Sequence, residues 1–386
     1  MDVSFRTVSS LPVGHDGLPA YQEHSSGPTI DVRVKIPDDP ADSPFEFVRI
    51  RLQTAVKTQI GTRTAVQKVL NLVEECSWSQ FVPLYAPASD KQRAYSAAIS
   101  FSRPAEKPLS RLSSRTNSLL PATNMYGTTY ITKHTALSDQ HAVEGRCETH
   151  IWVSADFFRH GVLVHSSRSA IELDTRPRLL ELGSSKQQPS GPLTTQCRPR
   201  MSGVKAGLTS FRKSTKAQSS LQVQLPTDSL IVSPSQLRNG RNCSTVSVPL
   251  QVSVTGLSSA DVKALLQDGG LRCEVETKWI SKHAFTAPTS STEHAASATV
   301  TKRTATTQHS DIAFPPVYEA DLPEESQVVS TTGVLVAMLP ESAALPTFSS
   351  ALLQVDYELE FKFLFRLGRC AIYEGKTRTP CTLARS

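Results

Sequence analysis

The residues with the most specific chemistry form a proline–tyrosine motif, Pro315-Pro316-Val317-Tyr318. Two adjacent prolines hold the backbone near the polyproline II conformation, so a groove that binds them orders the segment at little entropic cost. The tyrosine adds a flat apolar ring with a hydroxyl tip, which suits a second pocket. WW domains bind this pattern through aromatic-lined grooves. We therefore predict that Pro315, Pro316 and Tyr318 bind a WW domain.

Two further segments carry parts of the same pattern. Leu18-Pro19-Ala20-Tyr21 gives a second candidate WW site at Leu18, Pro19 and Tyr21, and Val82-Pro83-Leu84-Tyr85 gives a weaker one. The alternative for each motif, including Pro315 to Tyr318, is a turn that leads into a strand. We favour that alternative for the segment from Val82 to Tyr85 alone.

Catalytic and metal-binding patterns are missing from the sequence. It has no GxSxG, GxGxxG or P-loop motif. His134, His141, Cys147 and His150 come nearest to a metal-ligand set. Their gaps match no standard zinc pattern, and strand alternation would place Cys147 and His150 on opposite faces. We predict a non-enzymatic protein with no catalytic residue, metal or cofactor.

Composition fits two ordinary domains with polar connecting segments. The chain has 386 residues and is 39% hydrophobic, below the usual globular share because Ser, Thr and Pro are abundant. Its net charge of +6 is modest, and much of the excess falls in one linker, so we predict no nucleic-acid partner. The N-terminus lacks a secretory pattern, and the seven cysteines form no CxxC pair. These features predict reduced thiols and a cytoplasmic protein.

Alternation with a period of two predicts strands in the first half of the chain. Ile30, Val32, Val34 and Ile36 share one face of a strand. A slip in phase between Phe47 and Val48 predicts a β-bulge. A second apolar face follows, and a turn at His160-Gly161 leads into another strand; that face comprises Cys147, Thr149, Ile151, Val153, Ala155 and Phe157. Residues 28–175 are thus predicted to form an antiparallel β-sandwich.

A second β block follows at residues 218–368. Its one predicted helix runs from about Ser259 to Gln267, and Gly269 is the expected stop. The last strand has the longest apolar face: Leu353, Val355, Tyr357, Leu359, Phe361, Phe363, Phe365 and Leu367. Residues 1–27 are predicted to be a disordered tail, 176–217 a basic flexible linker and 369–386 a C-terminal tail. Low-complexity composition predicts loops near residues 102–124, 236–244 and 284–310.

Two β blocks with these strands resemble the arrestin fold, and in detail the α-arrestins of fungi. Three segments carry the resemblance. Asp42 to Leu52 is similar to the second-strand region of the arrestin N-domain, and Ile151 to Leu173 to its closing hairpin. The segment Leu345 to Leu359 resembles late strands of the C-domain. The resemblance covers about residues 28–368.

The resemblance implies an adaptor. Proteins of this kind bind membrane transporters or receptors and recruit HECT-type ubiquitin ligases, whose WW domains grip PPxY motifs. It also implies recruitment to the plasma membrane or endosomes, with peripheral membrane association. Such motifs often lie beyond the C-domain in the family, whereas Pro315 lies between two predicted strands. The alternative is an arrestin-fold trafficking scaffold of the retromer-subunit type, which sorts membrane cargo without a ligase.

Overall fold

The structure is a computed structural model that describes most of the chain. The described residues are 1–8, 26–37, 44–84, 92–102, 123–132, 140–171, 177–183, 193–199, 220–236, 242–256, 259–267, 270–287, 298–317, 328–340, 345–368 and 371–384. Of these residues 83% are strand and 3% helix, and the sheets are antiparallel. The predicted all-β class is therefore confirmed.

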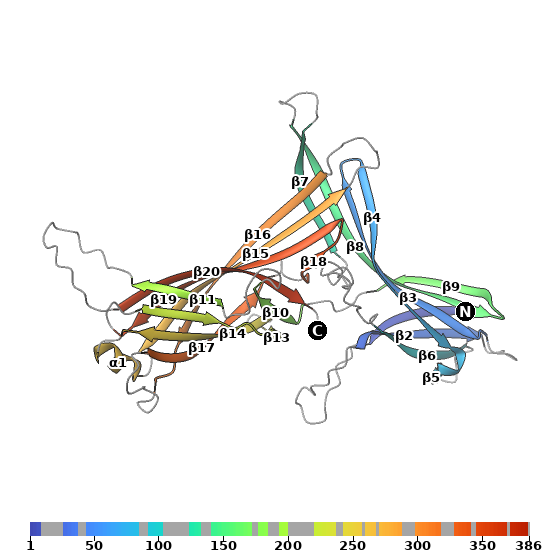
Figure 1. Cartoon of the computed structure of the whole chain (residues 1–386). Helices are drawn as coiled ribbons and strands as arrows, with labels where there is room; N and C mark the ends of the chain where they lie inside the picture. The colour runs from blue at the N-terminus through green and yellow to red at the C-terminus, as the bar shows by residue number, and fades with distance from the viewer. Residues whose placement is uncertain are drawn as a thin grey trace. The chain divides into compact units, whose positions relative to one another are not determined.

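The chain divides into two compact units (Figure 1). Unit 1 comprises Met1–Thr175, Ala284–Thr301 and Phe348–Gln354. Unit 2 comprises Arg176–His283, Lys302–Thr347 and Val355–Ser386.

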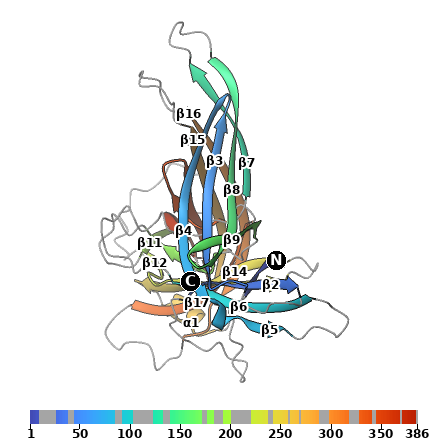
Figure 2. The same cartoon turned by 90° about the vertical axis from the view of Figure 1, so that its right-hand side faces the viewer.

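Unit 1 contains two antiparallel sheets. The first has the order β1 (Asp2–Val8), β2 (Ser26–Pro37), β6 (Gln92–Ser102) and β5 (Val82–Leu84). The second has the order β4 (Arg63–Ser77), β3 (Phe47–Ile60), β8 (Gln140–Arg159) and β7 (Thr123–Thr132), and β9 (Val162–Ala170) pairs with β8. A 3-10 turn, η1 (Trp78–Gln80), follows β4. Figure 2 shows β4, β3, β8 and β7 as long neighbouring strands.

The core of unit 1 lies between these two sheets. The predicted apolar face of β2 is buried, as are the alternate residues Val48, Ile50 and Leu52 of β3. Just before β3, the ring of Phe45 packs edge-on against Trp78, Phe81 and Phe157 at centroid distances of 4.9, 5.4 and 4.8 Å. Burial from both sheets into one cluster makes this unit a β-sandwich.

The hairpin of β8 and β9 follows the predicted pattern. The apolar face from Cys147 to Phe157 is buried along its whole length. His160 and Gly161 both have positive φ, 51° and 72°, as a tight two-residue hairpin turn requires.

The other strands form one eleven-stranded sheet. Along its main path the order is β10 (Leu179–Leu182), β13 (Leu230–Gln236), β14 (Asn242–Thr255), β12 (Ser220–Leu225), β11 (Leu193–Pro199), β20 (Ala371–Ala384), β19 (Leu353–Leu367), β15 (Leu271–Ala287) and β16 (Ala298–Ala313). Off this path, β17 (Val328–Leu339) pairs with β14, and β18 (Phe348–Ser349) pairs with β19. The helix α1 spans Ser259–Leu265, close to its predicted range.

Two short strands close part of this sheet on itself. β10 pairs with both β13 and β20. In β11, Leu193 to Cys197 pair with β12, whereas Arg198 and Pro199 pair with β20. Such corner strands supply hydrogen-bond partners where two layers of a sandwich meet.

Several expectations from the sequence differ from the structure. Residues 2–8 and 371–384 are strands rather than tails, because Val3 and Phe5 pack against the core of unit 1 and Tyr373, Cys381 and Leu383 are buried. The strands β10 and β11 lie within the segment predicted as linker. The loop predicted over residues 284–310 is wrong, since Ala298–Ala313 is a strand whose threonines favour extended backbone.

The predicted β-bulge is also misplaced. β3 keeps a continuous register with β4 and β8 through Phe47 and Val48, and its register with β4 shifts between Thr54 and Ala55 instead. The apolar pattern of the sequence slips in phase because it includes Phe45, which is buried although it precedes the first residue of β3.

The predicted inner face of β19 gives a stability test. Its eight apolar residues are all buried, and Phe363 is 2% exposed. Replacing Phe363 with Ala removes a ring from a packed interior, so the free energy of unfolding should fall by about 3–5 kcal/mol. Chemical denaturation of the purified chain measures the change. Lys362→Ala, which alters the outward face of the same strand, should lower the stability far less, and equal losses would contradict this packing.

Buried thiols predict a dependence of stability on alkaline pH. Burial raises the pKa of the Cys147 thiol and that of the Cys197 thiol to about 12 each. Between about pH 9 and 12 the unfolded chain therefore loses thiol protons that the folded chain retains, so stability falls as pH rises. Each thiol should contribute about 1.4 kcal/mol per pH unit in that window. Urea midpoints at pH 8 and pH 10 measure this, and a double Cys147→Ala, Cys197→Ala variant should show a shallower loss.

Candidate functional site

The first candidate site is the segment Pro315 to Val317, which follows β16. Its two ends are anchored in unit 2. Phe314 is buried, and its backbone N–H donates to the carbonyl of Leu271 at 3.1 Å. Val317 is buried as well, and its N–H donates to the carbonyl of Leu265, the last residue of α1, at 3.0 Å. The prolines are therefore held between two fixed points.

The prolines themselves face outward to different degrees. Pro315 is exposed and Pro316 is half-buried. The hydroxyl of Thr331 on β17 donates to the carbonyl of Pro315 at 3.5 Å, a long hydrogen bond. The segment belongs to no strand, because β16 ends at Ala313 and β17 begins at Val328. The prolines are thus not part of a sheet ladder.

The remaining motif residues lie outside the described part of the chain. This applies to Tyr318 and to Leu18, Pro19 and Tyr21. The weaker motif is described as far as Leu84. Val82, Pro83 and Leu84 form β5 and pair with Tyr95 and its neighbours on β6. These residues are therefore a strand themselves, and not the turn into a strand that was predicted for them.

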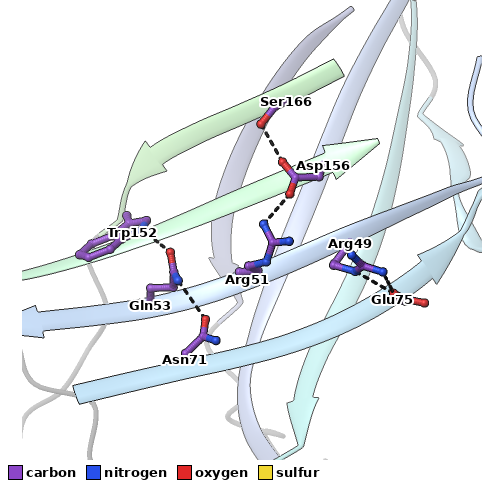
Figure 3. A network of polar contacts seen from close by, with 8 residues as sticks. All are labelled: Arg49, Arg51, Gln53, Asn71, Glu75, Trp152, Asp156 and Ser166. Carbon is purple, nitrogen blue, oxygen red and sulfur yellow. Dashed lines mark hydrogen bonds and ion pairs between the residues drawn. The ribbon is translucent and has the colours of Figure 1, made fainter. Parts of the chain in front are cut away.

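The second candidate site is a polar network on the outer face of the β3–β4–β8–β9 sheet of unit 1 (Figure 3). Arg51 of β3 donates to the carboxylate of Asp156 on β8, and Ser166 of β9 donates to the same carboxylate at 2.7 Å. One carboxylate therefore ties three strands together. Arg49 and Glu75 pair separately, with a closest distance of 2.8 Å.

Gln53 occupies the middle of a second chain of hydrogen bonds on this face (Figure 3). Its side-chain oxygen accepts from Trp152 Nε1 at 2.7 Å, and its side-chain nitrogen donates to Asn71 at 3.0 Å. The face exists because Arg49, Arg51 and Gln53 alternate with the buried Val48, Ile50 and Leu52. The two sets of contacts join side chains of β3, β4, β8 and β9, so they help to hold the register of these strands.

A shallow groove lies on the same sheet face. Its lining includes Lys57, Val66, His150, Trp152 and Arg168. The guanidinium of Arg168 stacks over the Trp152 ring at 4.3 Å. The groove offers cationic and aromatic groups and no carboxylate among its lining residues, so it suits a segment that carries acidic or apolar side chains.

Two of the residues considered for a metal, Cys147 and His150, are described, and their side chains lie on opposite faces of β8, as alternation predicted. Cys147 is buried and His150 is exposed, and His150 lies 3.2 Å from Glu148. His134 is outside the described residues, and the side chain of His141 is not described. Among the described residues, no group of three or more His, Cys, Asp or Glu could hold a metal ion.

Comparison with models of known protein families and with characterised proteins gives no match to this chain. The arrestin resemblance therefore rests on the three sequence segments quoted above. Within the described ranges, no helix has the length and apolar character needed to cross a bilayer.

The network of Asp156 was not predicted from the sequence. Arg51 stood in a segment with clear alternation, but its partner lies 105 residues away. The sequence showed only that each strand carries a charged residue on its polar face. Which charges pair depends on the register of β3 and β8, which the sequence does not give.

The carboxylate of Asp156 gives the next stability test. Asp156→Ala leaves Arg51 without this acceptor and breaks the link to β9, and the Asp156 side chain is only 16% exposed. We expect a loss of about 1–3 kcal/mol in the free energy of unfolding. Glu75→Ala breaks the more exposed pair with Arg49 and should cost at most about 1 kcal/mol. Urea denaturation of both variants measures the two losses of stability. Equal losses would mean that the contacts of Asp156 contribute no more to stability than the exposed pair of Arg49 and Glu75.

Proposed function

We propose that the chain is a non-enzymatic adaptor that recruits a WW-domain HECT ubiquitin ligase to membrane transporters or receptors. The observation that carries the proposal is the position of Pro315: exposed, outside any strand, and held between the buried Phe314 and Val317. A ligand segment that is fixed at its ends loses little entropy when a groove closes on it.

The motif spacing agrees with this placement. A polyproline II helix has three residues per turn, so in a bound PPxY peptide of that conformation the first and fourth residues project on the same side. Pro315 is the exposed residue of the described part, whereas Val317 points into unit 2. A WW domain that binds the exposed side would contact Pro315 without displacing Val317.

An adaptor also needs a surface for cargo. The groove lined by Lys57, Trp152 and Arg168 in unit 1 supports this part of the proposal, because it combines cations with an aromatic ring. Transporter or receptor tails with acidic side chains would suit it. Peripheral recruitment to the plasma membrane or endosomes would then follow the cargo.

Isolated WW domains of a HECT ligase provide the test. The full chain should bind them, and Tyr318→Ala should weaken binding by roughly 30-fold, since loss of a central aromatic contact costs about 2 kcal/mol. Tyr21→Ala tests the second motif, and the double variant should lose binding. Tyr126→Ala changes an exposed tyrosine of β7 outside any motif and serves as the matched control. Affinities from isothermal titration or pull-down give the comparison.

The same experiment addresses the alternative. Unchanged WW binding by the double variant would refute the ligase proposal and favour a trafficking scaffold of the retromer-subunit type that sorts membrane cargo without a ligase. Circular dichroism of each variant confirms that the fold is intact.

A further inference from the structure

The outer edge of β17 has an unusual composition for the edge of a sheet. β17 runs for twelve residues, Val328–Leu339, and contains no charged residue and no proline. Its described strand partner is β14 alone. Natural edge strands are commonly protected by charges, prolines or bulges, because their unpaired backbone groups attract other strands. The long, uncharged edge of β17 has none of these devices.

Pro249 establishes which backbone groups of β17 point to this edge. Pro249 of β14 lies opposite Val334 in the register of the two strands. Proline has no N–H to donate, so the Pro249–Val334 pair fits a position where the backbone groups point away from each other. The N–H and C=O of Val334, and of every second residue from it, are then directed outward.

Gln308 confirms this direction by bonding to the edge. Its side-chain oxygen accepts from the N–H of Met338 at 2.8 Å, and its side-chain nitrogen donates to the carbonyl of Val336 at 3.2 Å. A side-chain amide thus occupies the place that the peptide group of a neighbouring strand would take. Between Ser330 and Val334 no described strand pairs with this edge.

From Val334 to Met338 the side chains on the outward positions are apolar, whereas Ser330 and Thr332 before them are polar. Val334 is 53% exposed, Val336 51% and Met338 38%. The inward residues are buried, and a Cβ at Gly333 would come within 2.7 Å of the Phe314 ring, so the strand is tightly seated on the core. An added strand would meet a row of donors and acceptors and a strip of apolar side chains on one face.

We propose that the edge of β17 binds an extended segment of a partner protein by strand addition, and that this segment has apolar residues at alternate positions. The bound segment would displace the Gln308 side chain from the backbone groups of Val336 and Met338. Only another backbone in extended conformation matches a row of alternating N–H and C=O groups. A single segment fits better than a second copy of the chain, because β16 approaches the edge to within one glutamine side chain. The proposal does not depend on WW binding.

The probe is a fluorescent ten-residue peptide of alternating threonine and valine with a lysine at each end. Two N-methylated isomers accompany it, one methylated on the valines and one on the threonines. In strand addition only one set of amides faces β17, so one isomer should bind and the other should lose at least tenfold in affinity. Equal affinities of the two isomers would overturn the proposal, since contact through side chains alone does not distinguish them.

Variants of the chain locate the site. Val334→Pro removes an outward N–H and leaves the ladder to β14 intact, so it should weaken peptide binding at least tenfold. Val334→Thr keeps that N–H and is the matched control, with binding expected within about threefold of the original. Gln308→Ala removes the competing amide and should tighten binding several-fold.

Two outcomes would contradict the proposal directly. One is peptide binding that Val334→Pro leaves unchanged. The other is a dimer of the chain in sedimentation that Val334→Pro abolishes, which would make a second copy the occupant. Melting temperatures of Val334→Pro and Val334→Thr check the fold, and residue-resolved amide exchange should show slower exchange at 332 and 334 when the peptide is added to the unmodified chain.

Discussion

The requirement that every strand satisfy its backbone hydrogen bonds on both edges organises this chain. β14 meets it with three partners, since β12 and β13 pair with its two ends on one side and β17 runs along the other. β10 and β11 meet it at the corners of unit 2 by bonding to two strands each. Where the requirement is not met by a strand, as along β17, a side-chain amide partly takes its place.

The alternation of apolar and polar residues allowed the buried strands to be predicted from the sequence. Ile30 to Ile36, Cys147 to Phe157 and Leu353 to Leu367 each bury every second residue, and each was predicted because one face is almost wholly apolar. β16 was not predicted, because few of its residues are buried and its middle contains exposed threonine and alanine. β20 was not predicted either, because Gly375 and Pro380 interrupt its pattern, although Tyr373, Cys381 and Leu383 are buried.

The candidate sites were predictable to a lesser degree, since a site depends on distances between remote residues. The Pro315 motif is local in sequence, so its residues could be named in advance, but its anchoring by Leu265 and Leu271 required the fold. The Asp156 network and the Gln308 contact join strands whose register no single segment specifies. The proline motif and the β17 edge nevertheless meet, because Thr331 of β17 bonds to Pro315.

The close approach of β11 and β20 couples the side chains that two positions can accept. A Cβ at residue 375 would lie 2.3 Å from Cys197 Sγ and 3.4 Å from Cys197 Cβ. Any side chain at 375 therefore collides with the sulfur, whereas alanine at 197 would leave an ordinary contact. A side chain at residue 375 therefore requires the sulfur at residue 197 to move or to be absent, so the effect of a change at one position depends on the residue at the other.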